Sequence, residues 1–383
     1  MECEVAVIGA GIAGASAAAA ISATRSTIVI EREAQAGYHA SGRSAALFTE
    51  TYGNAAIRAL TIASRSFLAS PPQGFAAAPL LGARGALFVG GTAERHLLDE
   101  IYETAHRLVP SVRQMAADDV LAKVPAFRRE MVAGGVFEPD AMDIDTNGLL
   151  QGYLRQLRSR GGRLVTDSEV LALDRAPSGW RIETRGGTII AQFIVNAAGA
   201  WADDIARMAG ALPAGLTPKR RTAFLFKPPS EYDTGAWPLS IGAREDFYFK
   251  PDAGNLLVSP ADETPSIATD ASPEDIDIAI AADRVMTMTH LDIRHIAHRW
   301  AGLRTFAPDK TPVVGFDPDV AGFMWLAGQG GYGFQTSPAL AGCAADLVAG
   351  RPIAARLRDS GLAADMLSPA RFREPRKAAA VNA

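Results

Sequence analysis

The chain has 383 residues, of which 48% are hydrophobic and 21% are charged, and its formal net charge at pH 7 is −4. This length suits two domains with sizeable cores, and the slightly acidic balance gives no reason to expect binding to nucleic acid or to an anionic membrane. The two cysteines, Cys3 and Cys343, cannot build a disulfide framework, which fits a reducing compartment. We therefore expect a cytoplasmic protein and leave peripheral contact with a membrane open.

The first feature along the chain is an uncharged stretch over residues 5–23. It nearly reaches the roughly 20 apolar residues that a transmembrane helix needs. However, Glu2 and Glu4 precede it, which is the wrong charge for a signal peptide. Its many glycines and alanines are weak drivers of membrane insertion. We therefore predict no transmembrane segment here, and no other stretch is apolar enough to form one.

From this stretch to Glu31, the sequence has the pattern of a strand, a glycine turn, a helix, a second strand and an acid. Residues 5–8 include β-branched side chains suited to a buried parallel strand, and an Ala-rich helix follows the turn. Gly9 permits a tight turn, Gly11 lets a pyrophosphate approach the helix N-terminus, and Gly14 allows close packing of helix on strand. Glu31 ends the second strand at the spacing where an acid accepts ribose hydroxyls. The stretch predicts a dinucleotide with free ribose hydroxyls, FAD or NAD rather than NADP.

The rest of the chain alternates helical and strand patterns. Apolar spacing predicts helices over residues 54–69, 93–108, 116–123, 146–160, 273–288 and 338–348. Short strands are predicted over residues 87–89, 135–140, 163–166, 170–173, 180–184, 188–191, 192–195, 246–250, 255–259 and 323–327, and a hairpin joins 246–250 to 255–259. A second glycine turn, over residues 328–333, follows the last strand.

Cofactor-like segments recur at distant places with different material between them. We therefore predict a discontinuous cofactor-binding domain from residues 1–50, 140–215 and 305–366. Residues 51–139 and 216–304 would form a second domain, with a mixed sheet, that covers the cofactor and binds the substrate. Residues 367–383 would form a flexible tail.

Eight motifs resemble one known family almost end to end. They are VAVIGAGIAGASAA, REAQAGYHASGRSAA, DIDTNGLLQGYLR, VNAAGAWAD, PKRRTAF, FYFKPDAGNLL, WAGLRTFAPDKTPVVG and GQGGYGFQTS. Together they resemble the FAD-dependent D-amino acid oxidase (DAO) superfamily, and within it the bacterial D-arginine dehydrogenases most. The resemblance implies an α/β fold, α+β overall. A Rossmann-type FAD-binding domain would join a mixed-sheet substrate domain, in the glutathione-reductase-2-like architecture.

The resemblance also implies a set of FAD-binding residues. An N-terminal helix end after the second glycine turn would face the flavin N1/O2 edge, where negative charge develops on reduction. We expect the FAD to be non-covalent, because Cys343 fits a small core residue on a helix and His39 a loop hydrogen bond. The residues implied are Gly9, Gly11, Ile12, Ala13, Gly14, Glu31, Arg32, Ser41, Gly42, Arg43, Ser44, Ala45, Ala46, Val170, Ala198, Gly199, Trp201, Gly302, Gly330, Gly331, Tyr332, Gly333, Phe334 and Gln335.

The candidate catalytic residues are an arginine and a tyrosine, with two further candidates. Arg304 presents a planar fork that can bind a carboxylate in bidentate fashion, and the family uses an arginine at this motif position for that purpose. Tyr248 alternates with apolar neighbours on its strand, so its hydroxyl can reach the same carboxylate. Arg221 would add positive charge, and Tyr52 would close the pocket. The competing interpretation is ordinary: a strand tyrosine often only packs, and an arginine is often solvated or paired.

The predicted substrate pocket is lined by Leu47, Phe48, Ala86 and Gly331. The D-arginine dehydrogenase pattern would place a histidine at Leu47 and a glutamate at Ala86. A cationic side chain would therefore lack its counter-charge in a pocket of low dielectric, which is unfavourable. We predict a preference for neutral or apolar D-amino acids over D-arginine.

The predicted reaction is FAD-dependent oxidative deamination of a D-amino acid, with hydride passing from the substrate Cα to flavin N5 and the imine hydrolysing to a 2-oxo acid and ammonia. The electron acceptor is quinone-like or oxygen, and the resemblance favours a dehydrogenase over an oxidase. A sarcosine- or glycine-type amine oxidase, an FAD-dependent 2-hydroxy acid dehydrogenase and a non-catalytic flavoprotein stay open. We expect a monomer or a small homo-oligomer.

Two other kinds of site are discounted. His290, His295 and His298 crowd near Asp292, but polar histidines are more often ordinary surface or core residues, so we predict no metal site. Ser44 has no evident histidine and acid partners, so a hydrolase is not expected.

Overall fold

The computed structural model describes residues 1–353 and 355–373. The helices are α1 (Ile12–Ile21), α2 (Ala55–Ala69), α3 (Arg95–Leu108), α4 (Ala117–Lys123), α5 (Thr146–Ser159), α6 (Ala202–Met208), α7 (Asp275–Met288), α8 (Gly333–Val348), α9 (Ala355–Asp359) and α10 (Ala364–Leu367). The strands are β1 (Glu2–Ile8), β2 (Thr27–Ile30), β3 (Leu47–Phe48), β4 (Leu81–Ala83), β5 (Ala86–Gly90), β6 (Arg113–Ala116), β7 (Gly134–Glu138), β8 (Met142–Ile144), β9 (Arg163–Val165), β10 (Val170–Ala176), β11 (Gly179–Thr184), β12 (Gly187–Asn196), β13 (Thr217–Phe226), β14 (Leu239–Gly242), β15 (Tyr248–Asp252), β16 (Asn255–Ser259), β17 (Thr264–Pro265), β18 (His298–Phe306), β19 (Val313–Phe316) and β20 (Phe323–Ala327).

The first sheet has a parallel core in the spatial order β20, β12, β1, β2 and β9. The ribbon β10–β11 extends it from the first half of β12, and β19 pairs with β20 antiparallel. Alternating side chains put Val5 and Val7 in the core on one face and Ala6 and Ile8 in the core on the other. Because the parallel strands end at one edge, their carboxyl ends open a crevice there.

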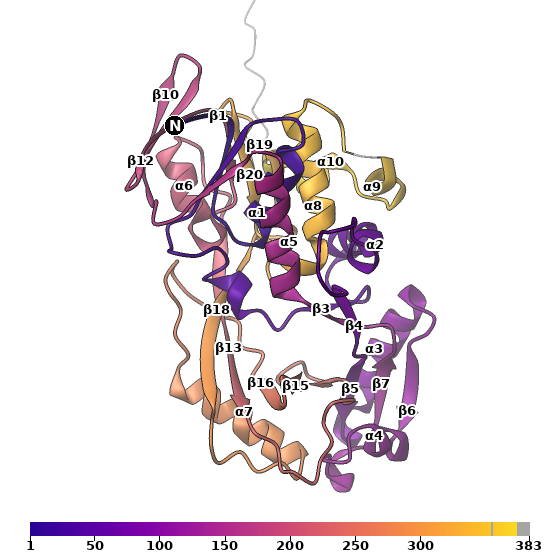
Figure 1. Ribbon diagram of the computed structural model, residues 1–383. Helices are drawn as coiled ribbons and strands as arrows, with labels where there is room; N and C mark the ends of the chain where they lie inside the picture. The colour runs from indigo at the N-terminus through magenta and orange to yellow at the C-terminus, as the bar shows by residue number, and fades with distance from the viewer. Residues whose placement is uncertain (354, 374–383) are drawn as a thin grey trace, which may run out of the picture.

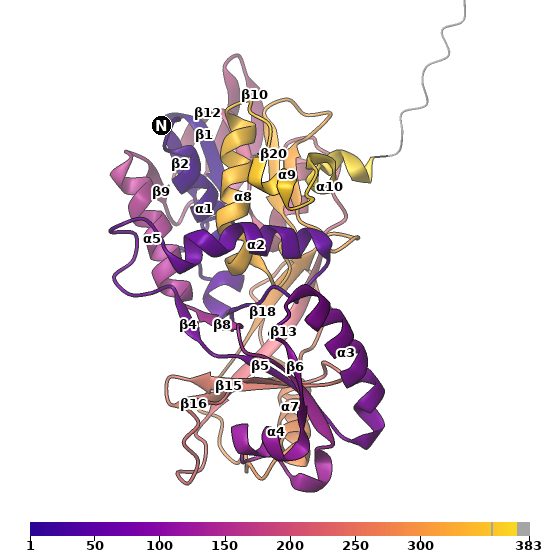
Figure 2. The same cartoon turned by 90° about the vertical axis from the view of Figure 1, so that its right-hand side faces the viewer.

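The second sheet lies in the lower half of Figure 1, in the order β17, β13, β16, β15, β14, β5, β7 and β6, with β18 beside β13. Helix α3 packs on one face of β5 and β7, and α4 and α7 pack on the opposite face of the sheet. A small sheet of β3, β8 and β4 lies between the two larger sheets (Figure 2).

Strands β13 and β18 form a long antiparallel pair that runs from one half of the molecule to the other (Figure 1). At its end, β18 is joined to the glycine turn after β20. Phe306 forms a bridge with Gln329, and the Gly330 N–H donates to the Thr305 carbonyl at 2.8 Å. The end of this strand is therefore tied by backbone hydrogen bonds to the second glycine turn.

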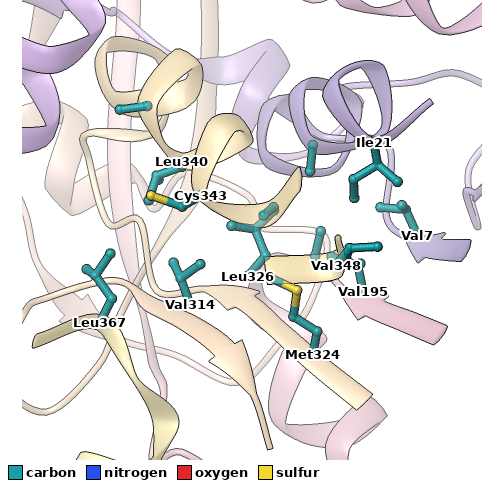
Figure 3. Packing of buried hydrophobic residues seen from close by; sticks show 14 of the residues in the cluster. Val7, Ile21, Val195, Val314, Met324, Leu326, Leu340, Cys343, Val348 and Leu367 are labelled. Atoms are coloured by element: carbon teal, nitrogen blue, oxygen red, sulfur yellow. The ribbon is translucent and has the colours of Figure 1, made fainter. Parts of the chain in front are cut away.

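The core of the first half is packed from segments far apart in the sequence. Figure 3 shows Ile21 of α1 near Val7 of β1, and Val195 and Met324 of the two neighbouring strands belong to the same cluster as Leu340 of α8. Cys343 is fully buried on α8 in the same cluster, which confirms the prediction that it is a small core residue.

Helix α8 begins at Gly333, five residues before the predicted start at Pro338. A proline inside a helix lacks an N–H for the carbonyl four residues earlier. Here the Ser337 hydroxyl donates to that carbonyl, of Phe334, at 3.0 Å. Its side chain thereby compensates for the missing backbone hydrogen bond, and the helix continues through the proline.

Two further segments differ from the predicted organisation. Helix α2 supplies Ala56, Ala59 and Leu60 to the core beside the first sheet, although residues 51–139 were assigned to the substrate domain. The domain boundaries otherwise stay a prediction. Of the predicted tail, residues 374–383 lie outside the described part of the chain. Residues 367–373 are packed: Leu367 is fully buried, and Arg373 pairs with Asp317 at 2.8 Å.

No helix within residues 1–353 and 355–373 has the length and apolar character needed to cross a membrane.

Candidate active site

A long cavity opens at the carboxyl ends of the first sheet's parallel strands and reaches the β13–β18 pair. Its wall includes the first glycine turn, the end of β2, the segment after β12, and the glycine turn before α8. Most of the predicted cofactor residues line it: Gly9, Gly11, Ile12, Ala13, Glu31, Arg32, Ser41, Arg43, Ser44, Ala45, Val170, Ala198, Gly199, Trp201, Gly302, Gly330, Gly331, Gly333 and Phe334.

The first glycine turn has no room for side chains at two of its positions. A Cβ on Gly14 would lie 1.9 Å from the Gly9 carbonyl oxygen, so this glycine keeps α1 against the end of β1. Gly9 has a φ of 101°, and a Cβ there would lie 2.5 Å from the Ala197 carbonyl oxygen. Both glycines are therefore required by backbone packing, and the cavity floor depends on them.

The acid after β2 is held by backbone donors. Glu31 Oε2 accepts a hydrogen bond from Ala10 N at 2.8 Å, and Oε1 accepts one from Glu33 N at 3.0 Å. The side chain is buried, yet it lines the cavity with its remaining acceptor capacity. Beside it, the Arg32 guanidinium lies 4.8 Å from the centre of the Trp201 ring.

A second region of the cavity is built by the turn before α8. Gly330 has a φ of 55°, and a Cβ on Gly331 would lie 3.0 Å from an Arg304 guanidinium nitrogen. This turn leads directly into α8, whose first residue is Gly333. The helix N-terminus carries partial positive charge, which favours an electron-rich group placed there.

Arg304, on β18, is half-buried and lies over Gly331. It forms no ion pair with any acidic side chain in the described part of the chain. Burial alone would lower the pKa of its guanidinium, but nearby hydroxyls and a carboxylate raise the pKa above its usual range. The groups that raise it are Tyr248, Tyr52, Tyr332 and Glu263. A cation without an acidic partner in a cavity wall can bind an anionic ligand.

The Tyr248 hydroxyl lies in the same group. Burial would raise its pKa, but the positive charges of Arg304 and Arg221 outweigh this and lower the pKa below its usual range. The neighbouring residue Phe249 is fully buried on the opposite face of the strand, as the alternation predicted. Tyr248 therefore presents its hydroxyl to the cavity between two arginines.

Arg221 is partly neutralised by its neighbours. Its Nε donates to the Asp262 carbonyl at 2.8 Å, and its terminal nitrogen lies 3.5 Å from Glu263. Glu263 is shared with Lys219 at 2.8 Å. Arg221 lines the cavity, but unlike Arg304 it already has an acidic partner.

The remaining predicted residues do not line this cavity. Gly14 lies in α1 against β1, Gly42 lies in the helical turn over Ala40–Arg43, and Ala46 packs against a core cluster. Tyr332 packs against Tyr52, with ring centres 5.0 Å apart, and both lie beside Arg304. The Gln335 side chain is buried and bonds Thr49 N and Thr61 Oγ1, so it belongs to the α2–α8 contact.

Three of the predicted pocket residues, Leu47, Phe48 and Ala86, do not line this cavity. The Phe48 ring is fully buried in a core cluster, because the two-residue strand β3 turns it inward while Leu47 stays half-buried. Ala86 is buried on β5, directly opposite Glu138 on β7. Of the four predicted pocket residues, Gly331 lines the cavity.

The structure adds polar groups that the motifs did not indicate. Asp270, in the segment before α7, pairs with Arg43 at 2.5 Å, while Thr269 and Ala271 beside it line the cavity. Glu138 is a buried acid hydrogen-bonded to two threonines. The sequence does contain a sign of Glu138, because it is the one charged residue in the otherwise apolar run GGVFE.

The histidines near Asp292 make other contacts. His298 stacks on Trp300, and His290 lies 3.3 Å from an Arg128 nitrogen. Residues 1–353 and 355–373 contain no group of three or more histidine, cysteine or acidic side chains arranged to hold a metal ion.

The cavity fits the flavin dinucleotide that the sequence predicts. A glycine turn at a helix N-terminus suits a pyrophosphate, and Glu31 beyond it suits a ribose. A Cβ on Gly199 would meet no atom within 4 Å, so the wall there is open for a ligand. The helix N-terminus of α8 suits the electron-rich edge of a flavin.

Comparisons with known proteins agree with the assignment of a flavin dinucleotide to this cavity. The glycine oxidase of Geobacillus kaustophilus (strain HTA426) is 24% identical over 368 residues, which cover 90% of this chain and 92% of that relative. The crystal structure of glycine oxidase from Geobacillus kaustophilus has a TM-score of 0.81 at 21% identity and covers 92% of this chain and 96% of its own. The crystal structure of L-proline dehydrogenase from P. horikoshii has a TM-score of 0.82 at 20% identity and covers 97% of this chain and 98% of its own.

A third structure, L-α-glycerophosphate oxidase from Mycoplasma pneumoniae with FAD bound, has a TM-score of 0.81 at 16% identity and covers 91% of this chain and 95% of its own. At these identities the structural likenesses show a shared fold. The family model described as FAD dependent oxidoreductase (DAO) matches residues 4–347. The chain therefore belongs to the DAO family of FAD-dependent oxidoreductases, with FAD as its cofactor.

Proposed function

We propose that this oxidoreductase deaminates D-amino acids with neutral side chains to 2-oxo acids and ammonia. Arg304 is the observation that carries the proposal: its guanidinium faces the cavity beside Gly331 and forms no ion pair within the described residues. A planar guanidinium suits the α-carboxylate that every amino acid presents. The D configuration is supported by the similarity of the motifs to those of D-arginine dehydrogenases.

The residues of the clamp would orient the substrate. Arg304 and the Tyr248 hydroxyl would hold the carboxylate and so place Cα over the flavin. Bound FAD would supply the two-electron acceptor for the substrate. Productive geometry needs the reacting atoms roughly 3–3.5 Å apart, which two fixed carboxylate contacts favour. The substrate amine must be neutral, because its lone pair forms the C=N bond as the hydride leaves.

The preference for a neutral side chain rests on the cavity wall around the clamp. Ala223, Leu303 and Gly331 line it beside Arg304 and Arg221, and none of these residues carries a negative charge. A guanidinium entering this region would therefore meet no counter-charge and would lie near two other cations, which is unfavourable in a buried setting.

A glycine- or sarcosine-type amine oxidase is the second candidate. It is favoured by one specific observation, the match to glycine oxidase over 92% of that relative. Such an enzyme would use the same carboxylate clamp with a smaller space for the side chain. Non-covalent FAD binding, the electron acceptor, the cytoplasmic location and the oligomeric state stay predictions.

A visible absorption spectrum of the purified holoenzyme, recorded without oxygen, tests the proposal. We expect the flavin bands to bleach with D-leucine, D-methionine or D-phenylalanine, and not with the L-forms. D-arginine should give a lower kcat/KM, by about tenfold or more, because transferring an unpaired charge into the pocket is costly. Bleaching only with glycine or sarcosine would move the assignment to the second candidate, and a D-arginine preference would overturn the neutral pocket.

The Tyr248 hydroxyl predicts a pH dependence. Because its pKa lies below the usual range, kcat/KM should fall with rising pH before pH reaches about 10, the ordinary tyrosine pKa. The ionised phenolate would no longer donate to the substrate carboxylate and would offset one arginine charge. Tyr248→Phe should lower the plateau of kcat/KM by about tenfold, as expected for a lost hydrogen bond to a charged group, and remove this alkaline fall.

The matched control is Tyr102→Phe, since Tyr102 lies on α3 and does not line the cavity. It should keep both the plateau and the alkaline fall. An unchanged alkaline limb in Tyr248→Phe would assign that limb to another group.

A further inference from the structure

Glu138 is a buried acid at the end of β7, and it contacts the loop that carries Tyr52. Glu138 is only 5% exposed. Its Oε1 and Oε2 each lie 2.9 Å from the Thr49 hydroxyl, and Oε2 accepts from the Thr51 hydroxyl at 2.7 Å. No lysine, arginine or histidine within the described residues forms an ion pair with it. Burial raises the pKa of its carboxyl, although both threonine hydrogen bonds act in the opposite direction.

A buried carboxyl without a cation is unfavourable for stability, so the gain it provides must come from its hydrogen bonds. Both threonines belong to one short loop between β3 and α2, residues 49–54, which we call the Tyr52 loop. Its other anchors include the Gly53 carbonyl, which accepts a hydrogen bond from the Arg58 guanidinium. Glu50 pairs with Arg65 at 2.7 Å, and Asn54 caps α2 by accepting from Ile57 N at 3.0 Å.

Tyr52 is the residue of this loop that faces the substrate clamp. It is 38% exposed, its ring packs against Tyr332, and its hydroxyl is among the groups that raise the pKa of Arg304. The anchors next to it in sequence are Thr51, whose hydroxyl is held by Glu138, and Gly53, whose carbonyl is held by Arg58 on α2. The position of the Tyr52 ring over the clamp therefore depends on both contacts, and the contact of Thr51 is the one that ties the loop to β7.

We propose that Glu138 is a positioning residue. Through its hydrogen bond with Thr51 it fixes the Tyr52 loop, and thereby sets the position of the Tyr52 ring relative to Arg304. The effect on substrate binding rests on the proposed function, whereas the effect on the loop does not. Glu138 contacts neither the cavity nor the clamp directly, since it does not line the cavity.

A rival role for Glu138 is recognition of a cationic substrate side chain, because it lies directly opposite Ala86. The hydrogen bonds disfavour this role: both carboxylate oxygens already have hydroxyl donors, and turning them to a substrate would release the loop. The two roles differ in what Glu138→Gln should do. Loss of a counter-charge lowers kcat/KM for D-arginine alone, whereas a loosened loop raises KM for every substrate.

The experiment compares Thr51→Val, which has the same shape without the hydroxyl, with Thr51→Ser, which keeps the hydroxyl. Amide hydrogen exchange of the holoenzyme over residues 49–54 should be about tenfold faster in Thr51→Val and close to wild type in Thr51→Ser. This measurement needs no substrate. Unchanged exchange in Thr51→Val would overturn the proposal, whatever the enzyme oxidises.

Kinetics then separate positioning from a general loss of stability. With a neutral D-amino acid, Thr51→Val should raise KM about fivefold while the rate of flavin bleaching at saturating substrate stays within about twofold. In a Tyr52→Ala background the same substitution should add no further rise in KM, because the loop then carries no ring to position. An additive rise, or a loss confined to D-arginine in Glu138→Gln, would contradict the proposal. Failure of every D-amino acid to bleach the flavin would overturn the proposed function instead. Amide hydrogen exchange over residues 49–54 would then still test whether Glu138 fixes the loop.

Discussion

Arg304→Met should lower kcat/KM for the preferred D-amino acid by about a thousandfold, mostly through KM. The substitution removes the cation that would bind the substrate carboxylate in a half-buried site, where losing one partner of a charge pair costs about 4 kcal/mol. Steady-state kinetics on the holoenzyme would measure this. The kcat/KM of Arg304→Lys should lie between those of wild type and Arg304→Met, because lysine keeps the charge and loses the bidentate geometry.

A matched control lies on the same strand. Arg299 is exposed on β18 and pairs with Asp275 at 2.5 Å. Arg299→Met should leave kcat/KM within about twofold, since an exposed ion pair contributes little. Equal losses in Arg299→Met and Arg304→Met would mean that the strand, rather than the guanidinium of Arg304, sets activity.

Gly14→Ala should yield protein without bound FAD. The added Cβ would lie 1.9 Å from the Gly9 carbonyl oxygen, a backbone atom that cannot move without the turn. Displacing α1 from β1 would distort the floor of the cavity, and overpacking of this severity should cost at least about 3 kcal/mol of stability. Flavin absorbance per protein after purification and the thermal unfolding midpoint would measure the two effects.

The control is Gly82→Ala on β4. A Cβ there would meet no atom within 4 Å, and the position has no positive φ. This variant should keep its flavin and its unfolding midpoint within a few degrees of wild type. Full flavin content in Gly14→Ala would show that the turn tolerates the displacement.

Features set by neighbouring residues could be predicted from the sequence. The strand, glycine turn and helix at the N-terminus lie where the spacing of Gly9, Gly11 and Gly14 placed them, and α5 lies within the predicted helix over residues 146–160. Each of these depends on contacts within a few residues, so the local pattern contains the necessary information.

Contacts between distant strands could not be predicted in this way. Ala86 was taken as a pocket wall, but its neighbour is set by the pairing of β5 with β7, which puts Glu138 opposite it. Similarly, Phe48 looked like a pocket residue because its loop follows the GRSAA motif, whereas the short pairing of β3 with β8 turns its ring into the core. Register between separate strands leaves little trace in local periodicity.

The hydrogen bond from Gly330 to Thr305 has a consequence for how this enzyme could change its substrate. It joins the residue next to Arg304 directly to the turn that leads into α8. If Arg304 holds the carboxylate as proposed, the offset between carboxylate and flavin is set by main-chain geometry. Side chains elsewhere, such as those of the Tyr52 loop, can then be exchanged without disturbing the distance over which the hydride travels. Selectivity for the side chain and alignment for the chemistry would evolve as independent traits.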